Sequence, residues 1–289
     1  MRALCLSVVP QTVGCNAKCR CCLSRTNFNV DGRKKLNLGV VRRACRFAKD
    51  MGAQSGIITG KGEPTMMDRV HLIDVIKVMG EYFSQIDFHT NGLLIPYLGP
   101  DFLRELYGVG LTNLTLSIAH YDDKKNAEVM GIKKPYIEKT FEWLNTYGDG
   151  IHIRLSCLLA RGYIDSPEEM KKYCDFATDH GVSAVVFRGL WVVDVRANQR
   201  TSAKDGKTDE DQWSRDHRVD MTTLFKEFIK TYGLPSIMSL PWGDVYEYRD
   251  MALTATECDY REKDFVKSLN LLPDNHLYYE WGSKASKLW

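Results

Sequence analysis

The sequence lacks the features that mark several classes of protein. It contains no run of about 18 apolar residues, the length that a membrane-spanning helix needs. Its 39 basic and 37 acidic residues leave a formal charge of +2, so no overall field favours nucleic acid or an anionic membrane. Nine cysteines in 289 residues are too few for a disulfide scaffold, and their odd number favours reduced thiols or a metal site. We therefore expect a globular protein that binds neither membranes nor nucleic acid.

The N-terminus does not have the pattern of a targeting signal. Residues 1–10 contain one basic residue and an apolar run too short for a signal peptide, and a cysteine-rich segment follows instead of a small-residue cleavage site. A buried β-strand that leads into a loop explains the same residues. We expect the protein to be cytoplasmic.

Strand-like and helix-like segments alternate over the first 190 residues. Six strands are predicted, at residues 4–9, 55–59, 86–89, 113–118, 152–158 and 184–193. Helical periodicity separates them, and Ser166 followed by Pro167 is a typical helix start. Such alternation is typical of parallel strands joined by right-handed crossovers. We predict an α/β fold, specifically a partial (β/α)6 TIM-like barrel.

The pattern changes after residue 195. We divide the chain into a barrel, residues 1–195, and a C-terminal extension, residues 196–289, which we expect to close the open side of the barrel. Half of residues 201–220 are charged, so we predict an exposed loop over 196–220, with a functional lid as the alternative. Beyond it, residues 221–232 are expected to form a helix.

Cysteine is unevenly distributed. Cys15, Cys19, Cys21 and Cys22 fall within eight residues, where a random scatter would place about a quarter of one cysteine. This loop follows the first predicted strand. In an α/β barrel the loops after the strands gather at one face and carry the active site. The crowding therefore predicts a metal centre at that face.

Other residues with useful chemistry follow the next strands. The second strand leads into Gly62-Glu63-Pro64, and the third leads into Thr90-Asn91. Ser117 ends the fourth strand, and Arg154 lies on the fifth. We expect these segments to meet the cysteine loop at one rim.

The three cysteines Cys15, Cys19 and Cys22 form C-x3-C-x2-C directly after the first strand. This motif resembles the signature of the radical S-adenosylmethionine (radical SAM) superfamily, and the Gly62-Glu63-Pro64 turn resembles the GGE motif of that superfamily. Lys61 replaces the first glycine of the motif. The resemblance covers residues 1–195 and implies a six-stranded partial barrel, an oxygen-sensitive [4Fe–4S] cluster and SAM as cofactors.

The resemblance also implies roles for individual residues. Cys15, Cys19 and Cys22 would each bind one iron and leave the fourth iron open for SAM, whose reductive cleavage gives a 5′-deoxyadenosyl radical that takes hydrogen from a substrate. Cys21 stands where the family often has an aromatic residue, and we expect a spectator thiol. The candidates for contacts to SAM are Gly62, Glu63, Pro64, Thr90, Asn91, Ser117 and Arg154.

The extension has no cysteine set for a second cluster, which favours a small organic or nucleotide substrate, as in the molybdenum-cofactor cyclase and viperin branches. Residues 279–285 loosely resemble the viperin C-terminus. One alternative is modification of a ribosomal peptide, such as epimerisation with Cys258 as the hydrogen donor. Another is a non-catalytic zinc or iron–sulfur protein, which the adjacent Cys21 and Cys22 disfavour for zinc. The expected electron donor is a flavodoxin or ferredoxin.

Overall fold

The computed structural model describes residues 2–26, 35–148, 150–192, 208–240, 243–256, 261–262, 265–281 and 283–289. Cys258, the candidate hydrogen donor, lies outside these residues. Among the residues described, every helix is too short or too polar to cross a bilayer.

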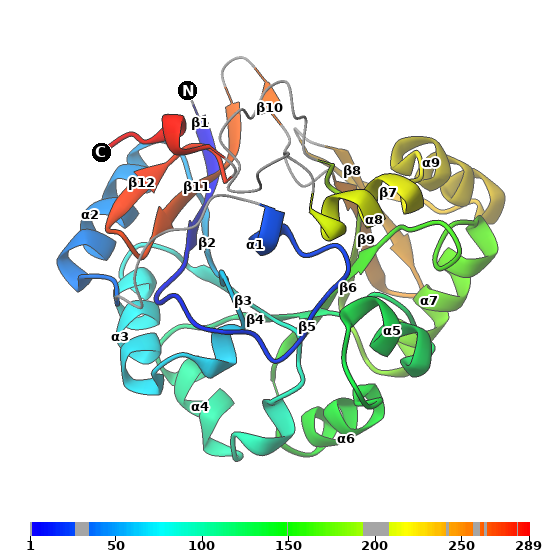
Figure 1. Cartoon of the computed structure of the whole chain (residues 1–289), viewed down its shortest axis with the longest axis horizontal. Helices are drawn as coiled ribbons and strands as arrows, with labels where there is room; N and C mark the ends of the chain where they lie inside the picture. The colour runs from blue at the N-terminus through cyan, green and yellow to red at the C-terminus, as the bar shows by residue number, and fades with distance from the viewer. Residues whose placement is uncertain are drawn as a thin grey trace.

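Six parallel strands form the centre of one curled sheet, and helices cover its outer face (Figure 1). They pair in chain order: β1 (Arg2–Val8), β2 (Ser55–Ile58), β3 (Gln85–Thr90), β4 (Asn113–Ser117), β5 (His152–Leu158) and β6 (Ala184–Arg188). The predicted partial barrel is confirmed, although the sixth strand ends at Arg188 rather than near residue 193.

Alternation along each strand separates the core from the barrel interior. On β1, Leu6 and Val8 are fully buried in the main apolar core, whereas Cys5 and Ser7 line a cavity inside the sheet. On β2, Ile58 likewise belongs to the core. Successive side chains of a strand point to opposite faces, so one face packs under the helices and the other is free for chemistry.

Helices connect the strands, and the helix that follows β5 begins at Pro167 as the sequence predicts. The larger ones are α2 (Leu38–Asp50), α3 (Arg69–Gly80), α4 (Asp101–Gly108), α6 (Ile137–Tyr147) and α7 (Pro167–Asp179). The Asn37 side chain caps α2, and the Ser166 side chain caps α7 by accepting from the amide of Glu169. The short helices α1 (Leu23–Thr26) and α5 (Asp123–Met130), and the 3-10 turns η1 (Pro64–Met66), η2 (Ile95–Tyr97) and η3 (Lys284–Ser286), lie in the loops.

The extension adds strands to both edges of the sheet. It contains α9 (Met221–Tyr232), as predicted, and the strands β7 (Ser236–Leu240), β8 (Gly243–Tyr248), β9 (Met251–Thr256), β10 (Arg261–Glu262), β11 (Phe265–Leu272) and β12 (His276–Tyr278). Strand β9 is parallel to β6, and β11 is parallel to β1, so eight strands of the described sheet are parallel. No ladder joins β9 to β11 in the described part of the chain, but Lys267 Nζ donates to Thr256 Oγ1 at 2.9 Å.

Of the exposed loop predicted over 196–220, residues 196–207 lie outside the described part of the chain, and the prediction is wrong for residues 209–217. Residues 209–217 form helix α8 (Asp209–His217), which Thr208 caps by accepting from the amide of Asp211. Acidic residues in its first turn and basic residues in its last turn complement the helix dipole. Trp213 supplies the packing, because its ring lies against Tyr163 and stacks on His217. The high charge content of residues 209–217 therefore led to the prediction of a loop where a capped helix forms.

Candidate active site

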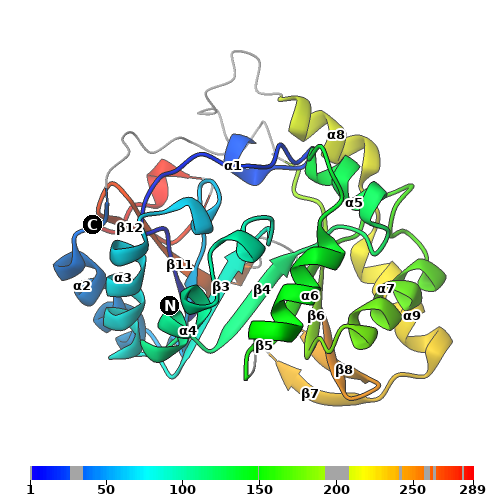
Figure 2. The same ribbon diagram turned by 90° about the horizontal axis from the view of Figure 1, so that it is seen from below.

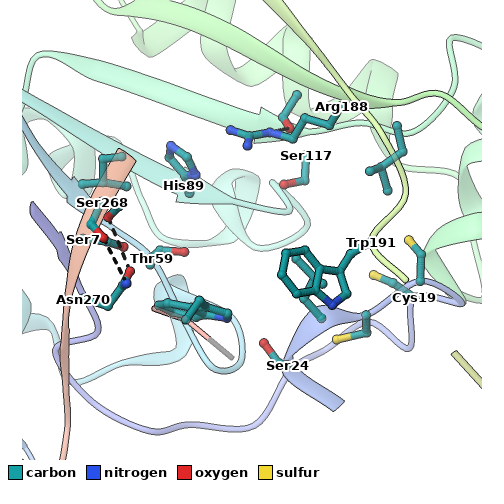
Figure 3. A pocket seen from close by; sticks show the side chains of 18 of the residues that line it. Ser7, Cys19, Ser24, Thr59, His89, Ser117, Arg188, Trp191, Ser268 and Asn270 are labelled. Carbon is teal, nitrogen blue, oxygen red and sulfur yellow. Dashed lines mark hydrogen bonds between the residues drawn. The ribbon is translucent and has the colours of Figure 1, made fainter. Parts of the chain in front are cut away.

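The carboxyl ends of the barrel strands surround a cavity of about 380 Å³, within the size range of small-molecule sites. Figure 3 shows side chains from several strands directed into it. Labelled wall residues include Ser7, Cys19, His89, Ser117, Arg188, Trp191, Ser268 and Asn270. No aspartate or glutamate is among the described residues of this wall, whereas Arg188 and Lys267 are.

The cysteine loop crosses one end of the barrel, together with α1 (Figure 2). Its backbone is anchored to the C-terminal end of α5: Lys18 N donates to Met130 O at 3.0 Å, and Arg20 N donates to Val129 O at 2.9 Å. The approach is close, because a Cβ on Gly131 would lie 2.1 Å from Lys18 O. Helix α5, which sequence periodicity did not predict, therefore holds the loop over the cavity.

The thiols of Cys19 and Cys22 lie in the cavity wall, and Cys15 is exposed beside them. Cys15 Sγ accepts from the amide of Ala17 at 3.5 Å. Burial, aided by the neighbouring Cys22 and Cys15, raises the pKa of Cys19 to about 12. Burial also raises the pKa of Cys15. A bound cation reverses such shifts, because metal coordination favours the thiolate.

This donor set fits a cluster with one open iron. A [4Fe–4S] cluster takes one thiolate per iron, and three cysteines from one anchored loop supply three. Among the residues described, no three His, Cys, Asp or Glu side chains converge on a single metal ion. Cys21 also reaches the cavity wall.

The loop after β2 lies directly against the cysteine loop. Glu63 N donates to Gly14 O at 3.1 Å. Gly62 has a φ of +132°, and a Cβ there would lie 2.2 Å from Val13 O. A side chain at position 62 would therefore force the two loops apart, which explains why the sequence has glycine there.

The Glu63 carboxylate joins the loops after β2 and β3. It accepts from Thr65 N at 3.0 Å and Thr65 Oγ1 at 2.7 Å, and from Thr90 Oγ1 and the amide of Asn91. Burial raises the pKa of Glu63, and these hydrogen bonds oppose the shift. Pro64 starts the turn η1 that follows. A carboxylate has about four acceptor positions, so protein donors engage the whole group.

Asn91 connects the loop after β3 to the cysteines. Its Nδ2 donates to Asn16 Oδ1 at 2.7 Å and lies 3.8 Å from Cys15 Sγ. Its backbone carbonyl accepts from Tyr136 OH at 2.8 Å. Of the residues predicted from the loop after β3, Asn91 is therefore the one in contact with a candidate cluster ligand.

Strands β4 to β6 place serine and arginine in the cavity. Ser117 lines it, in register with Ser156 of β5. Ser156 Oγ accepts from Arg188 Nε at 3.0 Å. Trp191 follows in the wall, and its Nε1 is buried with no hydrogen-bond partner among the residues described.

Arg154, the arginine predicted from sequence, is held elsewhere. Its Nη1 donates to Asp87 Oδ2 at 2.6 Å, and it is absent from the described wall of the cavity. Burial alone would raise the pKa of Asp87, but His89, Arg154 and Thr115 together hold it below its usual range. Arg188 is the arginine that reaches the cavity.

The extension was expected from sequence to close the open side of the barrel, but the residues that it contributes to the cavity wall were not identified. Ser268 and Asn270 on β11 face the cavity, and Asn270 Nδ2 donates to Ser268 O at 3.2 Å. The sequence does contain a pattern that predicts this strand, because the polar residues at 268 and 270 alternate with Leu269 and Leu271, which are fully buried in the core. Alternation of this kind predicts a half-buried strand.

Comparisons with known proteins agree with this arrangement. The radical SAM superfamily model matches residues 9–177, more than half of the chain. A search of curated proteins gave no match. The fold is similar to SuiB of Streptococcus suis bound to its precursor peptide SuiA, with 16% identity and a TM-score of 0.60 over 96% of this chain and 60% of SuiB. SuiB bound to S-adenosylmethionine gives the same score and identity, over 99% and 63%.

TYW1 with a lysine–pyruvate adduct is also similar, with 16% identity and a TM-score of 0.51 over 83% of this chain and 78% of TYW1. In comparison with SuiB, the chain spans about three fifths of the length of that protein. At these sequence identities the similarity to SuiB and TYW1 shows only the fold, and the match to the family model shows which family the chain belongs to. The chain belongs to the radical SAM superfamily, whose enzymes use a [4Fe–4S] cluster and S-adenosylmethionine.

Proposed function

We propose that this enzyme cleaves SAM reductively at a [4Fe–4S] cluster held by Cys15, Cys19 and Cys22, and abstracts hydrogen from a small organic or nucleotide substrate in the barrel cavity. One observation carries the proposal: two of the three thiols form part of the wall of a cavity whose size suits a small molecule. When bound, the cluster and SAM together would supply a 5′-deoxyadenosyl radical.

The chain's own residues would hold and orient these groups. The Asn91 amide donates toward Cys15 and would favour its thiolate form. Because protein donors engage the Glu63 carboxylate, we assign recognition of the SAM ammonium to backbone carbonyls of residues 60–62. Ser117 lines the cavity, and the buried Nε1 of Trp191 has no hydrogen-bond partner among the described residues, so both would meet polar groups of SAM or substrate. The aromatic rings of Trp191 and Trp281 would exclude water.

A second candidate function is modification of a ribosomal peptide. It is favoured by the likeness to SuiB bound to a precursor peptide, which extends over 96% of this chain and so includes the C-terminal extension. In that reaction Cys258 would return a hydrogen atom to the peptide radical. A short open reading frame beside the gene, encoding a peptide that stimulates SAM cleavage, would favour this candidate over a small substrate.

Anaerobic reconstitution tests the proposal. We expect about four irons per chain and formation of 5′-deoxyadenosine from SAM after reduction with dithionite. Protein that retains one zinc and never cleaves SAM would instead support the non-catalytic metal-binding alternative. Deuterated candidate substrates then identify the hydrogen abstracted, because deuterium appears in 5′-deoxyadenosine. Reduced flavodoxin or ferredoxin should replace dithionite as the electron source.

A further inference from the structure

We infer that the substrate carries an anionic group, a carboxylate or phosphate, which binds the guanidinium of Arg188. The inference rests on the proposed function, since it takes the barrel cavity as the substrate site. It goes beyond that function by naming a chemical class of substrate and the residue that selects it.

Arg188 is positioned for this role by the sheet. It is the last residue of β6, pairs in register with Leu158 of β5, and extends into the cavity (Figure 3). The hydroxyl of Ser156 accepts from its Nε at 3.0 Å and so fixes the orientation of the guanidinium plane. The two terminal nitrogens have no acidic partner in the described part of the chain.

Other half-buried arginines in the described part of the chain are paired with carboxylates. Arg154 pairs with Asp87 at 2.6 Å, and Arg42 pairs with Glu81 at 2.8 Å. Removing a charge from water without a partner is costly, so buried charges are normally paired. The half-buried Arg188 differs because the described cavity wall contains no carboxylate. A ligand anion would complete the pair.

A second positive charge lies close to Arg188. Thr256 of β9 pairs in register with Arg188, and Lys267 Nζ donates to Thr256 Oγ1 at 2.9 Å. Burial raises the pKa of the nearby Cys5 thiol; Lys267 and Arg188 oppose that shift, and Asp87 adds to it, so both cations lie near Cys5. Lys267 lies in the wall at this end of the cavity, and Arg188 offers the contact to an anion.

A guanidinium suits a carboxylate or phosphate particularly well. Its planar fork can donate two parallel hydrogen bonds to two oxygens of one anion, which fixes orientation as well as affinity. In a cavity that would also hold SAM, such an anchor would determine which substrate hydrogen is abstracted.

Equilibrium dialysis tests the inference with defined probes. Protein loaded with cluster and SAM is dialysed against radiolabelled benzoate, phenyl phosphate and benzamide. We expect at least one of the two anions to bind and the neutral amide not to bind, and the anion that binds more tightly distinguishes a carboxylate from a phosphate site. Arg188→Gln should weaken anion binding by about tenfold or more, because a hydrogen bond to a charged group is lost.

Two variants and one second measurement keep this test decisive. Arg188→Lys retains the charge without the fork and should give intermediate affinity, while Arg104→Gln removes an exposed arginine paired with Asp101 on α4 and should bind like the wild type. SAM affinity, measured in parallel, should be unchanged in Arg188→Gln. Circular dichroism shows that each variant is folded.

Several outcomes would overturn the inference. These are equal binding of benzamide, no binding of either anion, or anion binding that survives Arg188→Gln. If Arg188→Gln weakens SAM as much as the anion, Arg188 holds the carboxylate of SAM itself and the inference is wrong. Failure of the wild type to cleave SAM would count against the proposed function instead, because dialysis does not require cleavage.

Discussion

Gly62 and Val13 meet so closely that a Cβ on the glycine would lie 2.2 Å from the carbonyl oxygen of Val13. This contact joins the loop after β2 to the loop that carries the cysteines. The neighbouring hydrogen bond from Glu63 N to Gly14 O, at 3.1 Å, holds the same interface. The Gly62-Glu63-Pro64 turn and the cysteine loop therefore form one structural unit, and a substitution in one should disturb the structure of the other.

Gly62→Ala should destabilise this unit. The substitution adds a clash to a backbone conformation that alanine rarely adopts, and we expect a loss of about 2–5 kcal/mol in the free energy of unfolding and weaker SAM binding. Gly99→Ala is the control, because Gly99 also has a positive φ, +78°, but nothing lies within 4 Å of its Cβ position. Urea unfolding should show a loss of about 1 kcal/mol there. Equal losses at both positions would contradict the interpretation.

Replacing any one of Cys15, Cys19 and Cys22 by alanine should abolish cluster binding and reduce SAM cleavage to background, because each is expected to bind one iron. Cys21→Ala should retain both, since Cys21 is expected to be a spectator. Iron and sulfide content and 5′-deoxyadenosine formation are the measurements. Loss of the cluster in Cys21→Ala alone would overturn this choice of ligands.

Asn91→Ala should leave the cluster loosely held. The change removes the Nδ2 group that donates to Asn16 and approaches Cys15, and loss of such a supporting contact typically weakens a metal site by about tenfold or more. The rate of iron loss to a chelator, followed by absorbance, should rise accordingly. Asn145→Ala, at an exposed position on α6, should lose iron at the wild-type rate. Identical rates in the two variants would argue against the role of Asn91.

Lys61 should make stability depend on pH. Burial lowers the pKa of Lys61 to about 8 from an ordinary value of 10.5, so at neutral pH the folded state carries a penalty for the charged form. As pH rises from 8 to 10.5, the unfolded chain still binds the proton and the folded protein has released it, which relieves the penalty.

Between pH 7.5 and 10.5 the free energy of unfolding of the wild type should therefore rise by about 2–3 kcal/mol relative to that of Lys61→Met. Urea unfolding of the cluster-free protein at several pH values measures the difference, with Lys226→Met on the exposed side of α9 as the control. Parallel curves for the wild type and Lys61→Met would show that the lysine does not carry this penalty.

Local patterns in the sequence predicted most of the barrel. The six strands, the cap at Ser166, and the helix over residues 221–232 are all present in the structure. Helix α5 escaped prediction because it is short and polar, and α8 because its charges concealed its caps. Both contribute to the site, α5 by anchoring the cysteine loop and α8 through the ion pair between Glu210 and Arg25 on α1, at 2.8 Å.

The sequence by itself determined the chemistry of the site, because cysteine spacing and the glycine turn are local properties that a short segment carries wherever it folds. Only the tertiary structure decided which side chains share the cavity. Arg154 and Arg188 both lie on parallel strands, yet strand register sets the first against Asp87 and directs the second into the cavity. Strand β11 pairs with β1 across more than 250 residues of chain. Hydrogen bonds between strands so far apart in the sequence depend on how the whole sheet curls. No local sequence pattern therefore indicates which strands pair.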